Sequence, residues 1–297
     1  MHLNQNGAPM TKRRLLLIVL GFCAAAACSS PLWARSSRLS AAVALVNKGP
    51  AIEAFLQKPG TGYVQAYMRF GADFPDDVIV TLDQEWIESI ARPLYVKGGD
   101  WMALVGVQRA GGVWVAGGTE ATMNGQPSQA RNWTIFDLKT RLVPDSWYRF
   151  RIEADFGTRH FKSFTIDGPN LSRTIDLSAI PLDYPNFMPF SGPTMRYFTA
   201  AMRSRDMMKT EGTPLVYFDD VEGGVIDAIG HQHVVCADSF EAQKTVGPQP
   251  VTSPTIDLNG YRQGLWYLER DEAVFRIQAE PFARSGTHVG VADANLK

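Results

Sequence analysis

Short stretches rich in β-branched and aromatic residues, separated by turn-forming pairs, dominate this chain. The turn pairs recur throughout, as Gly98-Gly99, Gly117-Gly118, Asn124-Gly125, Asp167-Gly168 and Asn259-Gly260. Gly and Asn favour tight turns because they adopt backbone conformations that other residues avoid. Helical periodicity is scarce, and strands do not alternate with long helices. The pattern predicts an all-β fold, an antiparallel two-sheet β-sandwich of the jelly-roll type.

The expected strands run from residue 63 to residue 292. They cover residues 63–70, 78–82, 101–109, 113–116, 134–138, 147–156, 161–167, 215–221, 233–240, 264–268, 273–280 and 288–292. Two segments do not fit this pattern. Residues 84–91 fit two turns of helix, ended by Pro93, and residues 197–209 suit either a helix or a strand.

Composition narrows the class of partner. The chain has 297 residues, of which 45% are hydrophobic, and a formal net charge of −1. Because there is no excess of basic side chains to pair with phosphates, we expect no binding to nucleic acid. The length permits one large β domain or two small ones.

The N-terminal residues have the pattern of an export signal. A basic segment, Lys12-Arg13-Arg14, precedes the apolar run LLLIVLGFCAAAAC. We expect residues 1–34 to be a signal peptide with Met10 as its start, followed by a linker at 35–49. Cleavage after Ala34 would release a periplasmic or extracellular protein. Alternatively, residues 25–28 resemble a lipobox without its usual Leu, and Cys28 would then carry a lipid anchor to the envelope. Membrane contact is expected only through the signal or this anchor.

One cysteine remains if the chain is cleaved after Ala34. Cys236 then has no intramolecular partner for a disulfide. It lies beside two valines and is expected to be a small buried hydrophobic residue.

Residues 145–168 predict a hairpin with two different faces. Side chains alternate across a strand, so one face carries Tyr148, Phe150, Ile152, Ala154 and Phe156, and the other carries Arg149, Arg151, Glu153 and Asp155. A tight turn at Gly157-Thr158 would set Asp155 opposite His160 and Glu153 opposite Lys162. This register places Phe164 and Ile166 on the charged face. Either loops cover that face, or Arg149, Arg151 and Glu153 belong to a glycan-binding surface.

Three motifs in this order suggest a family. They are Trp147-Tyr-Arg-Phe-Arg-Ile-Glu-Ala-Asp-Phe156, Phe164-Thr-Ile-Asp-Gly168 and Val216-Tyr-Phe-Asp-Asp-Val221. Over residues 50–225 the chain resembles the concanavalin A-like, laminin-G-like jelly-roll superfamily. The resemblance implies a β-sandwich. It does not choose a function, because the superfamily includes lectin-like modules, glycoside hydrolases and polysaccharide lyases.

The C-terminal segment carries motifs with which domains of this superfamily often begin. These are Asp238-Ser-Phe-Glu241, Gly264-Leu-Trp266 and the segment from Ser285-Gly286 to Asp293. We therefore expect a circularly permuted single sandwich over 50–297, in which residues 238–297 complete the sheets. The alternative is a sandwich at 50–225 followed by an incomplete second domain.

Aromatic and acidic residues give the candidate sites. Trp114 follows a double-glycine turn and Trp133 lies in a polar stretch, so both are candidates for stacking on sugar rings. Glu153 and Asp155 could match the carboxylate spacing of glycosidases. Position 158, where the resembling glycoside hydrolases have a third acid, is Thr, so no catalytic residue is assigned.

Two acidic or histidine-containing stretches are candidate metal sites. Asp219 and Asp220 supply oxygen ligands of the kind that calcium prefers, which makes calcium the one candidate cofactor. His231 and His233 have zinc-ligand spacing on a strand, but the sequence sets no third ligand.

The leading hypothesis is an exported glycan-binding or surface-interaction module without catalysis, whose partner is a polysaccharide or another glycan. The first alternative is a polysaccharide-active enzyme, a glycoside hydrolase or lyase, on the same fold. The second is a structural envelope lipoprotein that binds protein partners. A groove with converging carboxylates would favour the enzyme, and exposed aromatic residues without them would favour the binding module.

Overall fold

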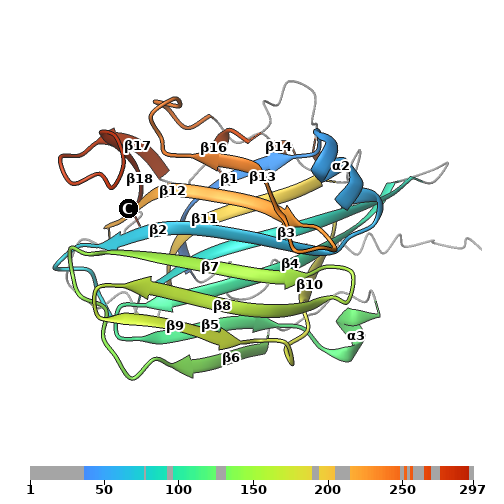
Figure 1. Ribbon diagram of the computed structural model, residues 1–297, viewed down its shortest axis with the longest axis horizontal. Coiled ribbons are helices and arrows are strands. Elements are labelled where there is room, and N and C mark those ends of the chain that lie inside the picture. The colour runs from blue at the N-terminus through green and yellow to red at the C-terminus, as the bar shows by residue number, and fades with distance from the viewer. Residues whose placement is uncertain are drawn as a thin grey trace, which may run out of the picture. The chain divides into compact units, whose positions relative to one another are not determined.

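The computed structural model describes residues 37–76, 78–91, 96–124, 132–188, 194–204, 215–247, 251–252, 255–256, 264–268 and 275–293. These residues form an antiparallel sandwich of two large sheets, which we name sheet A and sheet B (Figure 1). The predicted all-β class is confirmed. Among the residues described, no helix has the length and apolar character needed to cross a membrane.

Among the described residues, sheet A runs from β16 at one edge to β6 at the other. In spatial order it contains β16 (Trp266–Leu268), β1 (Ser37–Val46), β11 (Thr194–Ser204), β3 (Ile79–Ala91), β4 (Val96–Gln108), β5 (Gly112–Gly117) and β6 (Asn132–Asp137), and β10 (Asp183–Met188) also pairs with β4.

Sheet B contains the predicted hairpin, and Figure 1 shows β12, β2, β7 and β8 running side by side. Its order is β17 (Phe275–Ala279), β18 (His288–Asp293), β12 (Leu215–Ile226), β2 (Thr61–Phe70), β7 (Trp147–Asp155), β8 (His160–Gly168) and β9 (Leu171–Asp176), and β13 (Gln232–Asp238) also pairs with β12. The smaller elements are β14 (Val251–Thr252), β15 (Thr255–Ile256), α2 (Pro50–Gln57) and α3 (Glu120–Met123).

The hydrophobic core lies between the two sheets. Strand β7 contributes every second residue to it: Tyr148, Phe150, Ile152 and Ala154 are all fully buried. From sheet A, Val80 and Leu82 of β3 and Trp101 of β4 join the same core. Because side chains alternate across a strand, the residues between these positions point to the outer face of each sheet.

Two expectations about local structure are wrong, and one that was left open is decided. Residues 84–91, expected as helix, belong to β3, where pairing with β11 and β4 fixes an extended backbone. The segment at 197–209, left open between helix and strand, forms part of β11 as far as Ser204. Residues 37–46, expected in a linker, form β1, which pairs with β11 and β16. In each case a long-range partner decides the conformation, and the local pattern does not contain it.

The C-terminal segment contributes strands to both sheets. β16 pairs with β1 in sheet A, and β18 pairs with β12 in sheet B. β17 then extends sheet B at its edge. The domain boundaries themselves stay a prediction.

A β-bulge changes the predicted register of the hairpin. Asp155 does stand opposite His160, as expected, but Glu153 stands opposite Ser163, because Lys162 is the extra residue of the bulge. A shift of one residue moves every following side chain to the other face. Phe164 and Ile166 therefore face the core, where they are 1% and 0% exposed, and their expected place on the charged face is wrong.

Candidate functional site

The two tryptophans predicted as sugar-stacking residues meet on the outer face of sheet A. Trp114 lies on β5 and Trp133 on β6, at diagonal positions of the ladder. Their ring centroids are 6.0 Å apart with an interplanar angle of 76°, an edge-to-face contact. Both side chains are partly exposed, and Ile135 beside them is 54% exposed. We name Trp114, Trp133 and Ile135 the tryptophan surface.

Neighbouring residues hold the two rings in place. The indole Nε1 of Trp114 donates a 3.0 Å hydrogen bond to Oε1 of Gln108. A Cβ at Gly112 would lie 2.7 Å from that oxygen, so a larger residue there would displace the Gln108 amide. Trp133 packs on a small apolar cluster of Met102, Leu104 and Ala116. These contacts fix the orientation of both rings.

Buried carboxylates lie on the same face of sheet A. Asp83 and Glu85 of β3, Asp100 of β4 and Asp183 of β10 are each at most 3% exposed. Across the ladder, Leu104 stands opposite Asp83, and Met102 stands between Glu85 and Asp183. The carboxylates therefore lie one strand away from the residues on which Trp133 packs.

This acidic group was not predicted from the sequence. Asp83 and Glu85 fall in the segment that was expected to be helical, and a helix would not place them on one sheet face. The alternation of Val80 and Leu82 with Thr81 and Asp83 is the signal that could have found them. Among the described residues, no group of three His, Cys, Asp or Glu is arranged to hold a metal ion.

The other predicted glycan-binding residues lie on the outer face of sheet B. Arg151 stacks 4.1 Å from the ring centre of Tyr63, and its Nε donates a 2.9 Å hydrogen bond to Glu153. Its Nη1 donates to Oε1 of Gln65 at 3.1 Å. Arg149 pairs with Asp167 at 3.8 Å. The five predicted residues are thus divided between two faces and do not form one site.

Tyr63 shows how closely the face of sheet B is packed. The residue is fully buried, and its hydroxyl donates a 2.6 Å hydrogen bond to Glu222. Burial and the neighbouring Glu222 carboxylate raise the pKa of Tyr63 well above its ordinary value. The phenol is therefore neutral at physiological pH and serves as a hydrogen-bond donor within the fold.

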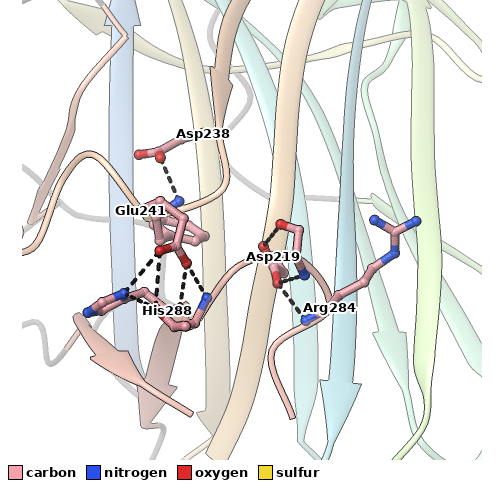
Figure 2. Close-up of polar contacts among 8 residues, drawn as sticks. Asp219, Asp238, Glu241, Arg284 and His288 are labelled. Carbon is pink, nitrogen blue, oxygen red and sulfur yellow. Dashed lines mark hydrogen bonds and ion pairs between the residues drawn. The ribbon is translucent and has the colours of Figure 1, made fainter. Parts of the chain in front are cut away.

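The predicted calcium ligands are engaged by the chain itself. Oδ2 of Asp219 accepts hydrogen bonds from the backbone N–H groups of Arg284 and Ser285, at 2.8 and 3.0 Å (Figure 2). Its Oδ1 accepts from the backbone N–H of Asp220 at 2.7 Å. Asp220 in turn pairs with the Arg284 guanidinium and accepts from the Ser285 hydroxyl at 2.7 Å. Burial raises the pKa of Asp219. The arrangement attaches the loop after β17 to β12, and calcium binding stays a prediction.

The carboxylate of Glu241 fixes the other end of that loop. Glu241 accepts hydrogen bonds of 2.6 Å from the backbone N–H groups of both Thr287 and His288 (Figure 2). These bonds to the charged form lower the pKa of Glu241 to about 2. Gly286 has a φ of +62°, and a Cβ there would lie 2.3 Å from the Glu241 carboxylate. The paired motifs at residues 238–241 and 285–293 therefore have a structural role.

The remaining candidates are Cys236, Cys28 and a histidine pair. Cys236 is 3% exposed, and burial raises the pKa of its thiol to about 12, so its predicted character as a buried hydrophobic residue is confirmed. Cys28 lies outside the described residues. His233 Nε2 lies 3.0 Å from Asp227 Oδ2, whereas His231 Nδ1 is 3.9 Å away from the same oxygen. Asp227 thus supports this exposed turn.

Comparison with known proteins identifies no family. No protein-family model and no curated protein matches the chain. Similar solved structures include Scytalido-glutamic peptidase with a peptide-based transition-state analog, at 10% identity and a TM-score of 0.33, covering 86% of this chain and 98% of that one. The PL-14 alginate lyase from Aplysia kurodai has 8% identity and a TM-score of 0.27, with 49% and 70% covered.

A further similar structure is a prokaryotic β-1,3-1,4-glucanase from a mouse hindgut metagenome. It has 11% identity and a TM-score of 0.23, and the match covers 54% of this chain and 75% of that one. These neighbours include a peptidase, a lyase and a glucanase, all at TM-scores below 0.5. They do not assign an activity, so any function rests on the residues of this chain.

Proposed function

We propose that the chain is a glycan-binding module and that the tryptophan surface is its binding site. The observation that carries this proposal is the contact between the partly exposed Trp114 and Trp133 on β5 and β6, beside the exposed Ile135. Sugar rings have an apolar face formed by C–H groups, and flat aromatic rings are suited to pack against it. The edge-to-face arrangement presents two ring planes, which suits a chain of several sugar units.

Affinity electrophoresis tests this proposal directly. The purified full-length protein is run through native gels that contain mixed-linkage β-glucan, galactomannan, arabinoxylan, alginate or polygalacturonate. We expect retardation in at least one gel. Trp114→Ala and Trp133→Ala should each weaken binding about tenfold or more, because truncation of an aromatic anchor costs roughly 2 kcal/mol.

Two controls separate binding from folding. Ile229→Ala removes an apolar side chain that is 78% exposed on the β12–β13 turn, and it should leave retardation unchanged. Trp133→Phe keeps an aromatic ring and should keep much of the affinity. If all variants are folded by circular dichroism and none of the five gels retards the wild type, the proposal is wrong for these glycans.

Glycoside hydrolysis is the second candidate, and Asp83 and Glu85 are the observation that favours it. They lie two residues apart on one face of β3, which corresponds to about 7 Å along a strand. Inverting glycosidases hold their two carboxyl groups about 6.5–9.5 Å apart. Release of reducing ends from a bound polysaccharide, abolished in Glu85→Gln while retardation persists, would establish this activity. Retardation without any release would establish a binding module only.

We also propose that the protein is exported, on the basis of the basic and apolar N-terminal segment alone. Residues 1–36 lie outside the described part of the structure. Mass spectrometry of the N-terminus of protein recovered from the producing cells would distinguish cleavage after Ala34 from lipidation at Cys28. An intact N-terminus retained inside the cell would contradict export.

A further inference from the structure

We infer that the edge strand β6 is an interface and that its partner is a second copy of this chain, paired antiparallel through β6 about a two-fold axis. This interface lies on the edge of sheet A and not on its face, so it can form whether or not the tryptophan surface binds glycans. Three observations carry it: the sequence and exposure of β6, the protection of the other sheet edges, and the self-complementary pattern of β6.

Strand β6 has the composition of a strand that pairs on both sides. Its sequence, NWTIFD, contains no Pro, Lys or Arg, and residues 133–136 are all β-branched or aromatic. Within the part of the chain that the structure describes, β6 pairs with β5 and no strand lies beyond it in sheet A (Figure 1). Thr134 is exposed, and Ile135 is 54% exposed. Such an edge presents backbone groups that can form a ladder with another strand.

The opposite edge of sheet A is covered by the chain itself. Gly247 forms a parallel bridge with Tyr267 of β16. The backbone N–H of Leu268 donates to the carbonyl of Gly247 at 3.0 Å, and the N–H of Gly247 donates to the carbonyl of Trp266 at 3.1 Å. The side-chain amide of Gln243 also bonds both backbone groups of Trp266, at 2.7 and 2.8 Å. This edge is therefore closed to another strand.

The edges of sheet B carry charges inside their strands. Arg173 lies in the middle of β9, and its place opposite the core residue Ile166 turns it toward the inside of the sandwich. Arg276 is the second residue of the short strand β17. Inward charges and short strands oppose pairing between sheet edges. The one charged residue of β6, Asp137, is its last, and it is balanced by Lys139 at 2.7 Å and by the nearby charge of Arg173.

Two copies of β6 are complementary when they pair antiparallel with Thr134 on the axis. Trp133 of each copy then stands opposite Ile135 of the other, and the two Asp137 side chains lie at opposite ends of the pair. Aromatic and β-branched residues form favourable cross-strand pairs, and the two-fold axis forms this contact twice. A register centred on Ile135 would instead set Trp133 opposite Asp137, so we expect the register centred on Thr134.

The strength of this association follows from its size. Two six-residue strands bury little surface compared with the roughly 1,200–2,000 Å² of stable complexes, so we expect a reversible dimer whose population depends on protein concentration. Paired residues share a face of the sheet. The dimer would therefore place two tryptophan surfaces side by side on one continuous sheet.

Sedimentation equilibrium of the full-length protein without glycan tests the interface. The wild-type mass should rise from one chain to two over about a hundredfold range of concentration. Thr134→Lys sets like charges opposite each other on the axis and should keep the mass at one chain. Thr174→Lys is the matched control, because it places the same charge at an exposed threonine of the other edge strand, β9, and it should behave as the wild type. Circular dichroism checks the folding of each variant.

Cross-linking tests the register. Residues directly opposite in an antiparallel pair have Cα atoms about 4.5–5.5 Å apart, which is within the range that a disulfide spans. Under mild oxidation, Thr134→Cys should therefore give a covalent dimer on a non-reducing gel. Thr174→Cys should give no more dimer than the wild type, which reports the background from the native cysteines.

Several outcomes would overturn the inference. A wild-type mass of one chain at every concentration does so, and so does a dimer that persists in folded Thr134→Lys, because its interface then lies elsewhere. Equal disruption by Thr174→Lys would show that β9 takes part, which the inferred pairing does not allow. If Thr134→Lys does not fold, cross-linking of Thr134→Cys at the level of Thr174→Cys is the contradicting result. Dissociation by Thr134→Lys without cross-linking of Thr134→Cys would support the β6 interface and contradict its register.

Discussion

The outer faces of the two sheets carry similar residue types in different arrangements. On sheet B, arginines and aromatic rings stack on one another, and the loop after β17 packs over them: Arg69 lies 3.7 Å from the ring centre of Phe282, and Arg284 lies 3.5 Å from that of Tyr67. On sheet A, Trp114 and Trp133 contact each other and remain partly exposed. A face whose groups satisfy one another stabilises the fold, whereas exposed, pre-oriented rings are available to a ligand.

The largest expected effect tests the β-bulge at Lys162, which turns Phe164 toward the core and away from the outer face of sheet B. Phe164→Ala should lower the free energy of unfolding by about 3–5 kcal/mol, because it leaves a cavity in the core. In the register without the bulge, the same side chain would lie on the outer face and its loss would cost far less. Urea unfolding measures the difference, and Phe164→Leu should be milder. A cost under about 1 kcal/mol would contradict the bulged register.

Release of the loop from sheet B should have the next largest effect. Asp219→Ala removes acceptors from three backbone N–H groups and should destabilise the fold by about 1–3 kcal/mol. Asp219→Asn keeps the shape and one acceptor, so it should cost less. Glycan retardation by the tryptophan surface should persist in both variants. Loss of retardation in folded Asp219→Asn would show that the two faces are coupled.

Removal of an arginine from sheet B should affect stability but not binding. Arg151→Ala loses its stacking on Tyr63 and its ion pair with Glu153, which together are worth about 1–2 kcal/mol at a side chain that is 11% exposed. Thermal unfolding measures the loss, and the gels measure binding. If Arg151→Ala abolishes retardation while the protein stays folded, the charged hairpin is the glycan site after all.

The smallest effect is a change in pH dependence. The pKa of Glu241 is about 2, below its ordinary 4.5, so its stabilising contribution is complete above pH 4.5 and is lost as the pH falls toward 2. The raised pKa of Asp219 acts in the opposite sense, because its contribution is complete below the ordinary 3.8 and is lost as the pH rises through the raised value.

Glu241→Gln should therefore flatten the acid side of the stability profile. We expect the unfolding temperature of the variant to fall less between pH 4.5 and pH 2 than that of the wild type. Gln243→Ala is the control, because it alters a neighbouring side chain without an acidic group. Parallel profiles for wild type and Glu241→Gln would show that the contribution of Glu241 to stability does not depend on its charge.

Local sequence determined the class of fold and much of its strand pattern. Alternation along residues 147–156 and the turn after Asp155 were sufficient to predict β7, the turn and the first pair of the hairpin. The positions of Trp114 and Trp133, next to turns and polar residues, were sufficient to select them as surface aromatics. These features depend on side-chain alternation and turn chemistry, which act between neighbours in the chain.

Only the tertiary structure decided which residues share a face. The extra residue at Lys162, the strand conformation of residues 84–91 and the burial of Asp83 and Glu85 all depend on partners far away in the sequence. The same holds for Asp219, whose ligand-like oxygens are used by a loop 65 residues later. Strand pairing and burial are set by contacts between distant segments, so a local pattern can name the chemical groups but not the site they form.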